Sequence, residues 1–305
     1  MKIAFLFVGQ GSQKVGMGKE VYDAYPQAKA LLDSVEVDFD VKKIMFEGPE
    51  EVLNDTSYTQ VCLVMTSLMI AKALEIEGIV ATGTAGLSLG EYSALTYAKA
   101  INLNKVIPLV RLRGQIMAEA LPIGFSSMSA VLSDKIDVIL ETLKENKTGI
   151  VEIANYNSPS QFVLSGEKEA LSIVEKNLKE KGISRIIPLK VSGAFHSSLL
   201  KEASRSLKIC LENAAFKSAE IPVYFNVSGE IEADVISALT LQIYNSVEWV
   251  KTIQNMIKDD YDTFIEIGPG KTLASLVRQI DPQVNVYSVE SCASIEKLKG
   301  ELKHE

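Results

Sequence analysis

The 305-residue sequence predicts an α/β fold with a mainly parallel sheet and a small α+β subdomain inserted into it. Two observations lead to this fold class. Short apolar runs alternate with longer segments of helical periodicity, which is typical of a parallel sheet covered by helices on both faces. Between residues 124 and 190 this alternation changes to a denser pattern of strands.

The elements expected before residue 124 alternate between strand and helix. Glycine-containing turns, GQGSQ and GLSLG, follow the two strands and mark their ends. The elements are a strand over 3–8, helical material to about residue 77 that includes the apolar stretch 61–74, a strand over 79–86, and helices over 91–99 and 104–120.

Residues 124–190 form the predicted small subdomain. Its elements are a strand over 127–132, a helix over 135–145, strands over 151–155 and 161–165 across an NSPS turn, a helix over 167–181 and a strand over 185–191. This β-α-β-β-α-β order is that of a ferredoxin-like unit. Residues 1–123 and 191–305 are then left for the large subdomain.

The chain after residue 191 is expected to return to the large sheet. The predicted elements are a helix over 199–213, a strand over 223–227, a helical stretch over 247–257, a strand over 263–267 that ends in GPG, a helix over 272–279 and a last strand over 285–289. They complete a sheet with helices on both faces.

Composition excludes several classes of function. A net charge of −8 argues against broad nucleic-acid binding, and it lets an acidic partner dock only on a local basic patch. Three well-separated cysteines without a CxxC pair favour a reducing compartment. The N-terminal apolar run is too short for a signal peptide, and no stretch approaches the roughly 20 apolar residues of a membrane span. We therefore expect a cytoplasmic monomer without a membrane partner.

The segment GLSLG fits the nucleophile elbow G-x-S-x-G and lies between a predicted strand and a predicted helix. In such an elbow Ser88 occupies a strained turn that only small neighbours tolerate, and its hydroxyl is exposed for attack. The alternative is a glycine-rich helix entry without chemistry. The position between strand and helix favours the nucleophile.

A serine nucleophile needs a base, and the chain has only two histidines. His304 is the penultimate residue of a charged tail, whereas His196 follows the closing strand of the small subdomain, in a loop at the subdomain junction. A histidine buried in the core without a catalytic role is the alternative. No Asp or Glu near His196 offers itself as a third member, so a backbone carbonyl is a possible orienting group.

Arg113 lies on the apolar side of the predicted helix 104–120. It shares a helical stripe with Val106, Val110 and Met117, whereas Arg111 projects from the opposite side. A buried guanidinium must be paired. The helix alone leaves two interpretations open: an internal salt bridge, or a fork that binds a substrate carboxylate bidentately.

Six segments in order resemble the malonyl-CoA:acyl-carrier-protein transacylases of fatty-acid synthesis, which are similar in turn to the acyltransferase domains of polyketide synthases. They are GQGSQ (9–13), GLSLGEYSAL (86–95), RLRGQIM (111–117), NSPSQ (157–161), GAFHS (193–197) and IEIGPGK (265–271). The resemblance covers nearly the full length and implies an α/β-hydrolase-like large subdomain with a ferredoxin-like small one.

The resemblance also implies roles for individual residues. Ser88 would be the acylated nucleophile and His196 its base, and Arg113 would hold the malonyl carboxylate. The backbone N–H groups of Gln10 and Leu89 would form the oxyanion hole. The main-chain carbonyl of Gln242, in LQIYNSVEW, would orient the histidine. Malonyl-CoA would be the donor and an acyl carrier protein the acceptor, without a metal or a bound cofactor.

Two further positions bear on specificity. Phe195 resembles the malonyl-selecting form of the GAFHS motif. Leu87 departs from the family, which usually has a histidine there, and this departure concerns the polarity of the pocket and the rate of hydrolysis. Arg185, Lys190, Lys271 and Arg278 flank the predicted cleft as candidate docking residues for an acidic carrier.

Three other functions compete with malonyl transfer. A hydrolase that removes acyl groups from carriers would use the same serine and histidine, but it has little need of an arginine clamp. A trans-acting acyltransferase of polyketide synthesis fits the same residues. A binding module without catalysis is disfavoured by the intact pair of Ser88 and His196.

Overall fold

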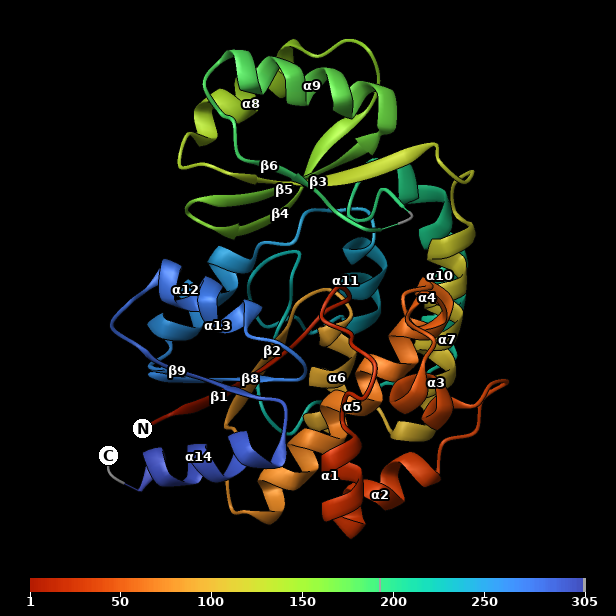
Figure 1. Ribbon diagram of the computed structural model, residues 1–305, viewed down its shortest axis with the longest axis vertical. Helices are drawn as coiled ribbons and strands as arrows, with labels where there is room; N and C mark the ends of the chain where they lie inside the picture. Colours follow the sequence, from red (N-terminus) through yellow and green to blue (C-terminus); the bar gives the residue numbers. More distant parts are fainter. Residues whose placement is uncertain (192, 304–305) are drawn as a thin grey trace.

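The computed structural model describes residues 1–191 and 193–303 and shows two sheets, one above the other in Figure 1. The larger sheet has five strands in the order β7-β2-β1-β8-β9, and all neighbouring strands are parallel. Its strands are β1 (Ile3–Phe7), β2 (Gly83–Gly86), β7 (Val223–Tyr224), β8 (Thr263–Ile267) and β9 (Asn285–Val289). The predicted fold class, with its mainly parallel sheet, is confirmed.

Helices cover the large sheet on both sides. In Figure 1, α12 and α13 lie above β8 and β9, and α14 lies below them. The helices of this part are α1 (Lys19–Ala24), α2 (Pro26–Asp33), α3 (Val41–Glu47), α4 (Glu50–Leu53), α5 (Thr56–Ile76), α6 (Gly90–Tyr97), α7 (Leu103–Glu119), α10 (Lys201–Glu212), α11 (Val235–Gln242), α12 (Trp249–Lys258), α13 (Thr272–Ile280) and α14 (Cys292–Leu302), with a 3-10 turn η1 (Ser198–Leu200).

Helix α5 is the central helix of the large subdomain, and it is apolar on nearly every side. It contacts the first four helices, then α6, α7 and β8, which is why its sequence shows no polar face. Its 21 residues are long and apolar enough to cross a membrane, so the expectation that no stretch approached this length was wrong. However, 83% of its most apolar window is buried inside the fold, and α5 is therefore a core helix.

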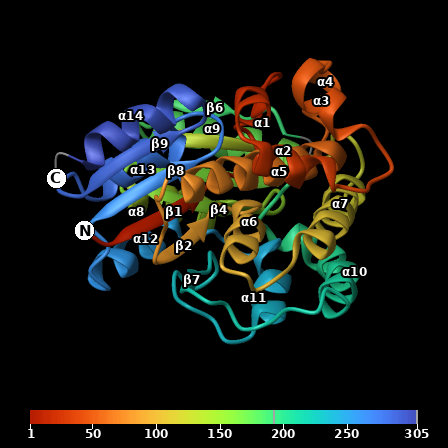
Figure 2. The ribbon, with the colours of Figure 1, turned by 90° about the horizontal axis from the view of Figure 1, so that it is seen from below.

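The smaller sheet is antiparallel, with the order β4-β5-β3-β6. Its strands are β3 (Ser126–Leu132), β4 (Val151–Ser158), β5 (Gln161–Glu167) and β6 (Ile186–Pro188), and α8 (Ile136–Glu145) and α9 (Lys168–Glu180) cover one face (Figures 1 and 2). The β-α-β-β-α-β order and this pairing are those of the ferredoxin-like unit that the sequence predicted.

The two faces of the small sheet have different partners. Val131, Phe162 and Leu164 point to α8 and α9 and share a core with them. Met128 and Val163 belong instead to the core of the large subdomain, as expected for side chains that alternate along a strand. Two backbone hydrogen bonds join this sheet to Val247, in the segment before α12. The Tyr156 N–H donates to Val247 O (2.9 Å), and the Val247 N–H donates to Ala154 O (2.8 Å).

Some elements differ from the sequence prediction. β2 begins at Gly83 rather than at residue 79, because Gly78 has φ 79° and Ile79 N–H still bonds back to Leu74 of α5. β7 covers two residues rather than 223–227, because the Phe225 N–H bonds to Glu230 O in a turn. Helices α11 and α14 were not predicted at all.

Candidate active site

The GLSLG turn connects β2 to α6 and holds Ser88 at φ 52°, a left-handed conformation. Its glycines allow a close backbone approach that no other residue permits. A Cβ at Gly86 would lie 1.9 Å from the carbonyl carbon of Gly90, and a Cβ at Gly90 would lie 2.1 Å from Phe7 O on β1. Contacts this short never occur between real atoms, so the turn requires glycine at both positions.

Asn226 braces the turn from the neighbouring strand. Its side-chain oxygen accepts a hydrogen bond from Ser88 N–H (2.6 Å), and its side-chain nitrogen donates to Gly86 O (2.7 Å). Asn226 is completely buried and follows β7, which pairs with β2. These two bonds flank Leu87 and fix the backbone that leads into Ser88.

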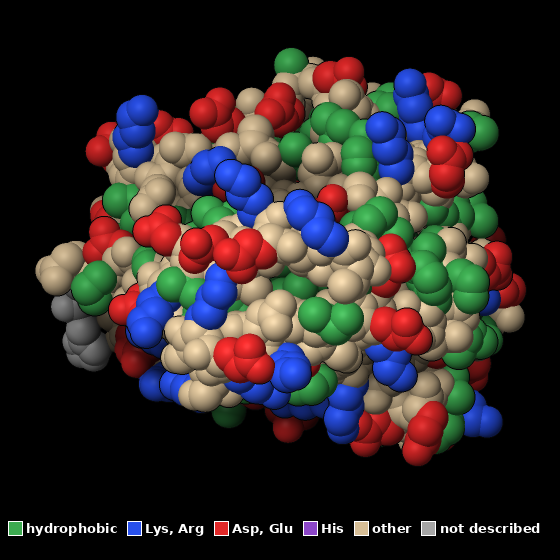
Figure 3. Space-filling view, turned by 90° about the horizontal axis from the view of Figure 1, so that it is seen from above, with side chains coloured by type: hydrophobic (Ala, Val, Ile, Leu, Met, Phe, Trp, Pro, Cys, Tyr) green, Lys and Arg blue, Asp and Glu red, His purple; other side chains and the backbone are tan. Residues whose placement is uncertain are grey.

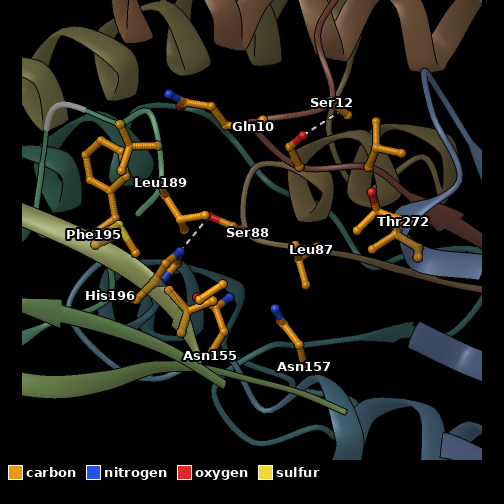
Figure 4. Close-up of a pocket in the computed structure, with 18 of the residues that line it drawn as sticks. Gln10, Ser12, Leu87, Ser88, Asn155, Asn157, Leu189, Phe195, His196 and Thr272 are labelled. Atoms are coloured by element: carbon orange, nitrogen blue, oxygen red, sulfur yellow. Dashed lines mark hydrogen bonds between the residues drawn. The ribbon is translucent and has the colours of Figure 1, made fainter. Parts of the chain in front are cut away.

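His196 lies between Ser88 and the main chain of Gln242. Its Nε2 is 2.7 Å from Ser88 Oγ (Figure 4), and its Nδ1 is 2.7 Å from the Gln242 carbonyl oxygen. Because a carbonyl oxygen only accepts, Nδ1 carries the proton, and Nε2 is free to accept from the serine hydroxyl. The other histidine, His304, lies outside the described residues.

Burial lowers the pKa of His196 to about 4, and the nearby positive charge of Arg113 acts in the same direction. The hydrogen bond to the Gln242 carbonyl opposes this shift only in part. The imidazole is therefore neutral at physiological pH and can act as a base.

Arg113 is 1% exposed and sits next to the serine. Its Nη1 donates to Gln60 Oε1 (2.8 Å), and its Nη2 donates to Gln242 Oε1 (2.9 Å) and to Ser88 Oγ (3.3 Å). All of these acceptors are uncharged, and no carboxylate among residues 1–191 and 193–303 forms an ion pair with it. The internal salt bridge, one of the two interpretations left open by the sequence, is not present there.

The guanidinium is held by aromatic contact as well. It lies 5.2 Å from the ring centroid of Tyr92, and its Nε is buried without a partner in the described part of the chain. Burial lowers the pKa of Arg113, although the guanidinium stays protonated at neutral pH. The result is a fixed cation whose charge is neutralised by no direct partner within residues 1–191 and 193–303.

The backbone N–H groups of Gln10 and Leu89 take part in no hydrogen bond among the described residues. The Gln10 side chain bonds to Thr56 Oγ1 (2.9 Å) and so anchors the loop after β1. A Cβ at Gly9 would lie 2.5 Å from Leu87 O, so this loop is pressed against the elbow. The fold thus leaves two donors unused beside the serine.

These groups open into a cleft of about 240 Å³ between the two subdomains (Figure 4). Apolar side chains from the small sheet form one wall, and the loop after β1, the elbow and the start of α13 form the other. Phe195 and Leu87 both line the cleft, so an apolar side chain stands where the resembled family has a histidine. Polar lining residues include Asn155, Asn157 and Gln161.

Known proteins share this architecture over the whole chain. Residues 4–304 match the family described as "Acyl transferase domain". The malonyl CoA-acyl carrier protein transacylase of Bacillus subtilis is 40% identical over 311 residues, which cover 100% of this chain and 98% of that protein. This chain belongs to the malonyl CoA-acyl carrier protein transacylase family.

Solved transacylase structures have the same fold. The transacylase of Clostridium perfringens is 40% identical with a TM-score of 0.94, and the match covers 100% of this chain and 98% of the other. A malonyl-transacylase in complex with a type II PKS acyl-carrier protein is 34% identical with a TM-score of 0.95, covering 99% of this chain and all of the other. The family resemblance of the six segments is confirmed.

Within this transacylase fold, the structure brings Ser88, His196, Arg113 and Gln242 into one hydrogen-bonded cluster. Gln10 lines the cleft, and Leu89 is buried in the elbow. Sequence reasoning missed three buried polar residues that support the cluster: Gln60, Glu91 and Asn226. Of these, Glu91 lies in the quoted segment GLSLGEYSAL, but no local pattern marks Asn226.

The elbow packing predicts that Gly90→Ala destabilises the fold, because the new methyl group meets backbone rather than a movable side chain. We expect a loss of at least about 1–3 kcal/mol in chemical denaturation. Gly300→Ala is the matched control, since it lies in α14 with open space around it and is expected to be neutral or to stabilise by up to about 1 kcal/mol. Equal stability of the two variants would contradict the packing argument.

The low pKa of His196 predicts an acid-tolerant nucleophile. The rate at which a fluorophosphonate labels Ser88 is expected to fall with a midpoint near pH 4 rather than near 6.5, the ordinary histidine value. The same shift lowers fold stability as the pH falls from 6.5 toward 4, because the unfolded chain binds a proton that the folded chain does not. Circular dichroism at each pH is the control that separates loss of labelling from unfolding. A midpoint near 6.5 would refute the prediction.

Proposed function

We propose that this chain transfers the malonyl group of malonyl-CoA to the phosphopantetheine thiol of an acyl carrier protein, through an ester on Ser88. One observation carries the proposal. An uncompensated guanidinium, Arg113 Nη2, lies 3.3 Å from the same serine oxygen that lies 2.7 Å from His196 Nε2. Nucleophile, base and carboxylate-binding fork thus converge on one atom of the cleft.

The first half-reaction forms the ester. His196 Nε2 takes the proton from Ser88 Oγ as the oxygen attacks the thioester carbonyl, and the Gln242 carbonyl stabilises the resulting imidazolium. The free N–H groups of Gln10 and Leu89 are the proposed donors to the oxyanion. The tetrahedral intermediate collapses, the C–S bond breaks, and the coenzyme A thiolate takes the proton from His196.

Arg113 selects the acyl group in this proposal. Its hydrogen bonds go to neutral amide and hydroxyl oxygens, so its positive charge is available to a substrate carboxylate. The carboxylate of a malonyl group lies one methylene from the reacting carbonyl, which matches the short distance between the fork and Ser88 Oγ. An acyl group without a carboxylate would leave a buried charge unpaired.

The second half-reaction repeats these steps in reverse. The carrier thiol gives its proton to His196 and attacks the malonyl ester, and Ser88 leaves with that proton. The relative that was solved as a complex is described as the malonyl-transacylase of a type II PKS acyl-carrier protein. In this scheme no metal or bound cofactor takes part.

Docking of an acidic carrier is proposed to use local cations around the cleft. Arg185, Lys190, Lys271 and Arg278 are all exposed, and Arg278 also donates to the Val286 carbonyl oxygen (2.5 Å). Seen from the small-subdomain end, Lys and Arg side chains are mixed with Asp and Glu, without a large region of one charge (Figure 3). The proposed docking surface is therefore small. The monomeric state and the cytoplasmic location stay predictions.

The competing functions are less well supported. A carrier hydrolase would use Ser88 and His196 but would have no need of an uncompensated Arg113 beside them. A binding module without catalysis does not account for a correctly oriented Ser-His pair. Fatty-acid and polyketide carriers present the same phosphopantetheine thiol, so the proposed chemistry is common to both.

The test of the function is the intact mass of the enzyme after incubation with acetyl-, malonyl- or methylmalonyl-CoA. We expect a stoichiometric malonyl adduct, little of the other two, and discharge of the adduct when a holo acyl carrier protein is added. Ser88→Ala is expected to lose the adduct and keep its fold. A malonyl adduct that only water discharges would favour the hydrolase, and a normal adduct in Ser88→Ala would place the nucleophile elsewhere.

The clamp predicts a change of selectivity in Arg113→Ala. Loss of a bidentate partner in a dry pocket costs about 2–5 kcal/mol, or roughly 30-fold to several thousandfold in kcat/KM for malonyl-CoA. Acetyl-CoA transfer is expected to stay or to rise. Arg111→Ala is the matched control, because Arg111 lies on the same helix but pairs with Asp38. If both acyl donors fall equally in Arg113→Ala, the arginine has only a structural role.

A further inference from the structure

Glu91 is a fully buried acid directly behind the nucleophile. It lies in the first turn of α6, three residues after Ser88, and none of its surface is exposed. Burial raises the pKa of Glu91 to about 8, although hydrogen bonds from Asn226 and Gln242 and the charge of Arg113 favour its ionised form. It forms no ion pair within the described residues, and the transfer chemistry does not call on it. A buried acid of this kind needs another explanation.

The two oxygens of Glu91 bind two separate segments of the chain. Oε1 accepts a hydrogen bond from the main-chain N–H of Asn226, which follows β7. Oε2 accepts one from the side-chain nitrogen of Gln242, at the end of α11. These segments lie 135 and 151 residues further along the chain. One side chain therefore fixes the distance between the segment after β7 and the end of α11.

Each of the two partners supports a reacting group. Asn226 holds the backbone of Ser88 and of Gly86, as described for the elbow. Gln242 contributes its main-chain oxygen to His196 Nδ1 and its side-chain oxygen to Arg113 Nη2. A shift of either segment would move the serine, the imidazole or the guanidinium.

The orientation of the Gln242 amide is settled by its neighbours. Its nitrogen lies 2.9 Å from Ser88 O, which can only accept, and its oxygen lies 2.9 Å from Arg113 Nη2, which can only donate. The nitrogen therefore points toward Glu91. The amide stands between the acid and the guanidinium, so that Glu91 holds the fork in place without pairing with it directly.

We propose that Glu91 is a positioning residue of the transfer reaction, which ties Asn226 and Gln242 together and through them aligns Ser88, His196 and Arg113. This role rests on the proposed function only in one respect, which is that malonyl transfer is the reaction for which the three residues are aligned. Glu91 does not touch the substrate.

An acid is needed at this position because two N–H donors meet it. An ionised carboxylate accepts from both of them, and these two hydrogen bonds favour the ionised form against the burial that raises the pKa of Glu91. The isosteric amide of glutamine instead places an NH2 group against one of the donors. That contact would push either Asn226 or Gln242 away from its place. Aspartate keeps both oxygens but is one methylene shorter, so it can maintain one contact at full strength and not both.

The test compares Glu91→Gln and Glu91→Asp by the rate of fluorophosphonate labelling at Ser88. This reagent forms an O–P bond with the serine, loses fluoride and needs His196 as base, but it carries no malonyl group. We expect labelling to slow by about 10- to 100-fold in Glu91→Gln, the effect of a misplacement of about 1 Å, and by less in Glu91→Asp. We also expect the malonyl-to-acetyl ratio of Ser88 acylation to fall in Glu91→Gln.

Ile295→Ala is the control for stability. Ile295 is a fully buried residue of α14, a helix at the opposite end of the molecule from the small sheet (Figure 1). Its truncation is expected to lower the melting temperature while labelling stays normal. Labelling at the wild-type rate in Glu91→Gln would overturn the proposal. If Glu91→Gln does not fold, a wild-type rate in Glu91→Asp would overturn it equally.

The labelling assay separates this inference from the proposed function. If the wild-type enzyme is labelled rapidly but takes no malonyl group, malonyl transfer is contradicted. The labelling rate of Glu91→Gln then still tests whether Glu91 aligns Ser88 and His196. Wild-type enzyme that takes malonyl, with no change in Glu91→Gln, would contradict the inference alone.

Discussion

The structure depends on a backbone contact between β1 and the turn that follows β2. Gly90 approaches Phe7 O so closely that no side chain fits between them, and Gly86 approaches Gly90 in the same way. This contact forces Ser88 into its left-handed conformation and points its hydroxyl into the cleft. It also brings the loop after β1, with the free N–H of Gln10, to the same place. The positions of Ser88, the proposed nucleophile, and of the nearby donor are thus consequences of one packing constraint.

A second constraint concerns the buried charge of Arg113, which is surrounded by side-chain amides rather than by carboxylates. Gln60 and Gln242 occupy the hydrogen-bonding positions around Arg113 that carboxylates would take in a salt bridge. A direct pair would satisfy the guanidinium and close it to a substrate. Neutral amides orient the guanidinium and leave its charge in place, while the low pKa of His196 keeps the imidazole neutral next to that charge.

The sequence was informative where structure depends on neighbouring residues. GLSLG is a local pattern, Arg113 follows from helical periodicity, and His196 was found because the alternatives were few. The roles of Gln10, Leu89 and Gln242 came only through family resemblance. Asn226 and Glu91 escaped because their partners lie more than 130 residues away, where no local pattern records the contact. Helix α14 was missed because its capping box pairs Ser291 with Ser294 rather than with the usual Glu or Gln.

The small sheet contributes one wall of the cleft and keeps its own core on the opposite face. Along β3, Met128 and Ala130 line the cleft, whereas Val131 packs beneath α8 and α9. Because successive side chains alternate, the lining can change in size or polarity without touching the residues that fold the subdomain. None of the reacting groups lies on these strands. Evolution can therefore remodel the substrate range of such an enzyme by point substitutions in one wall, with the chemistry and the fold inherited intact.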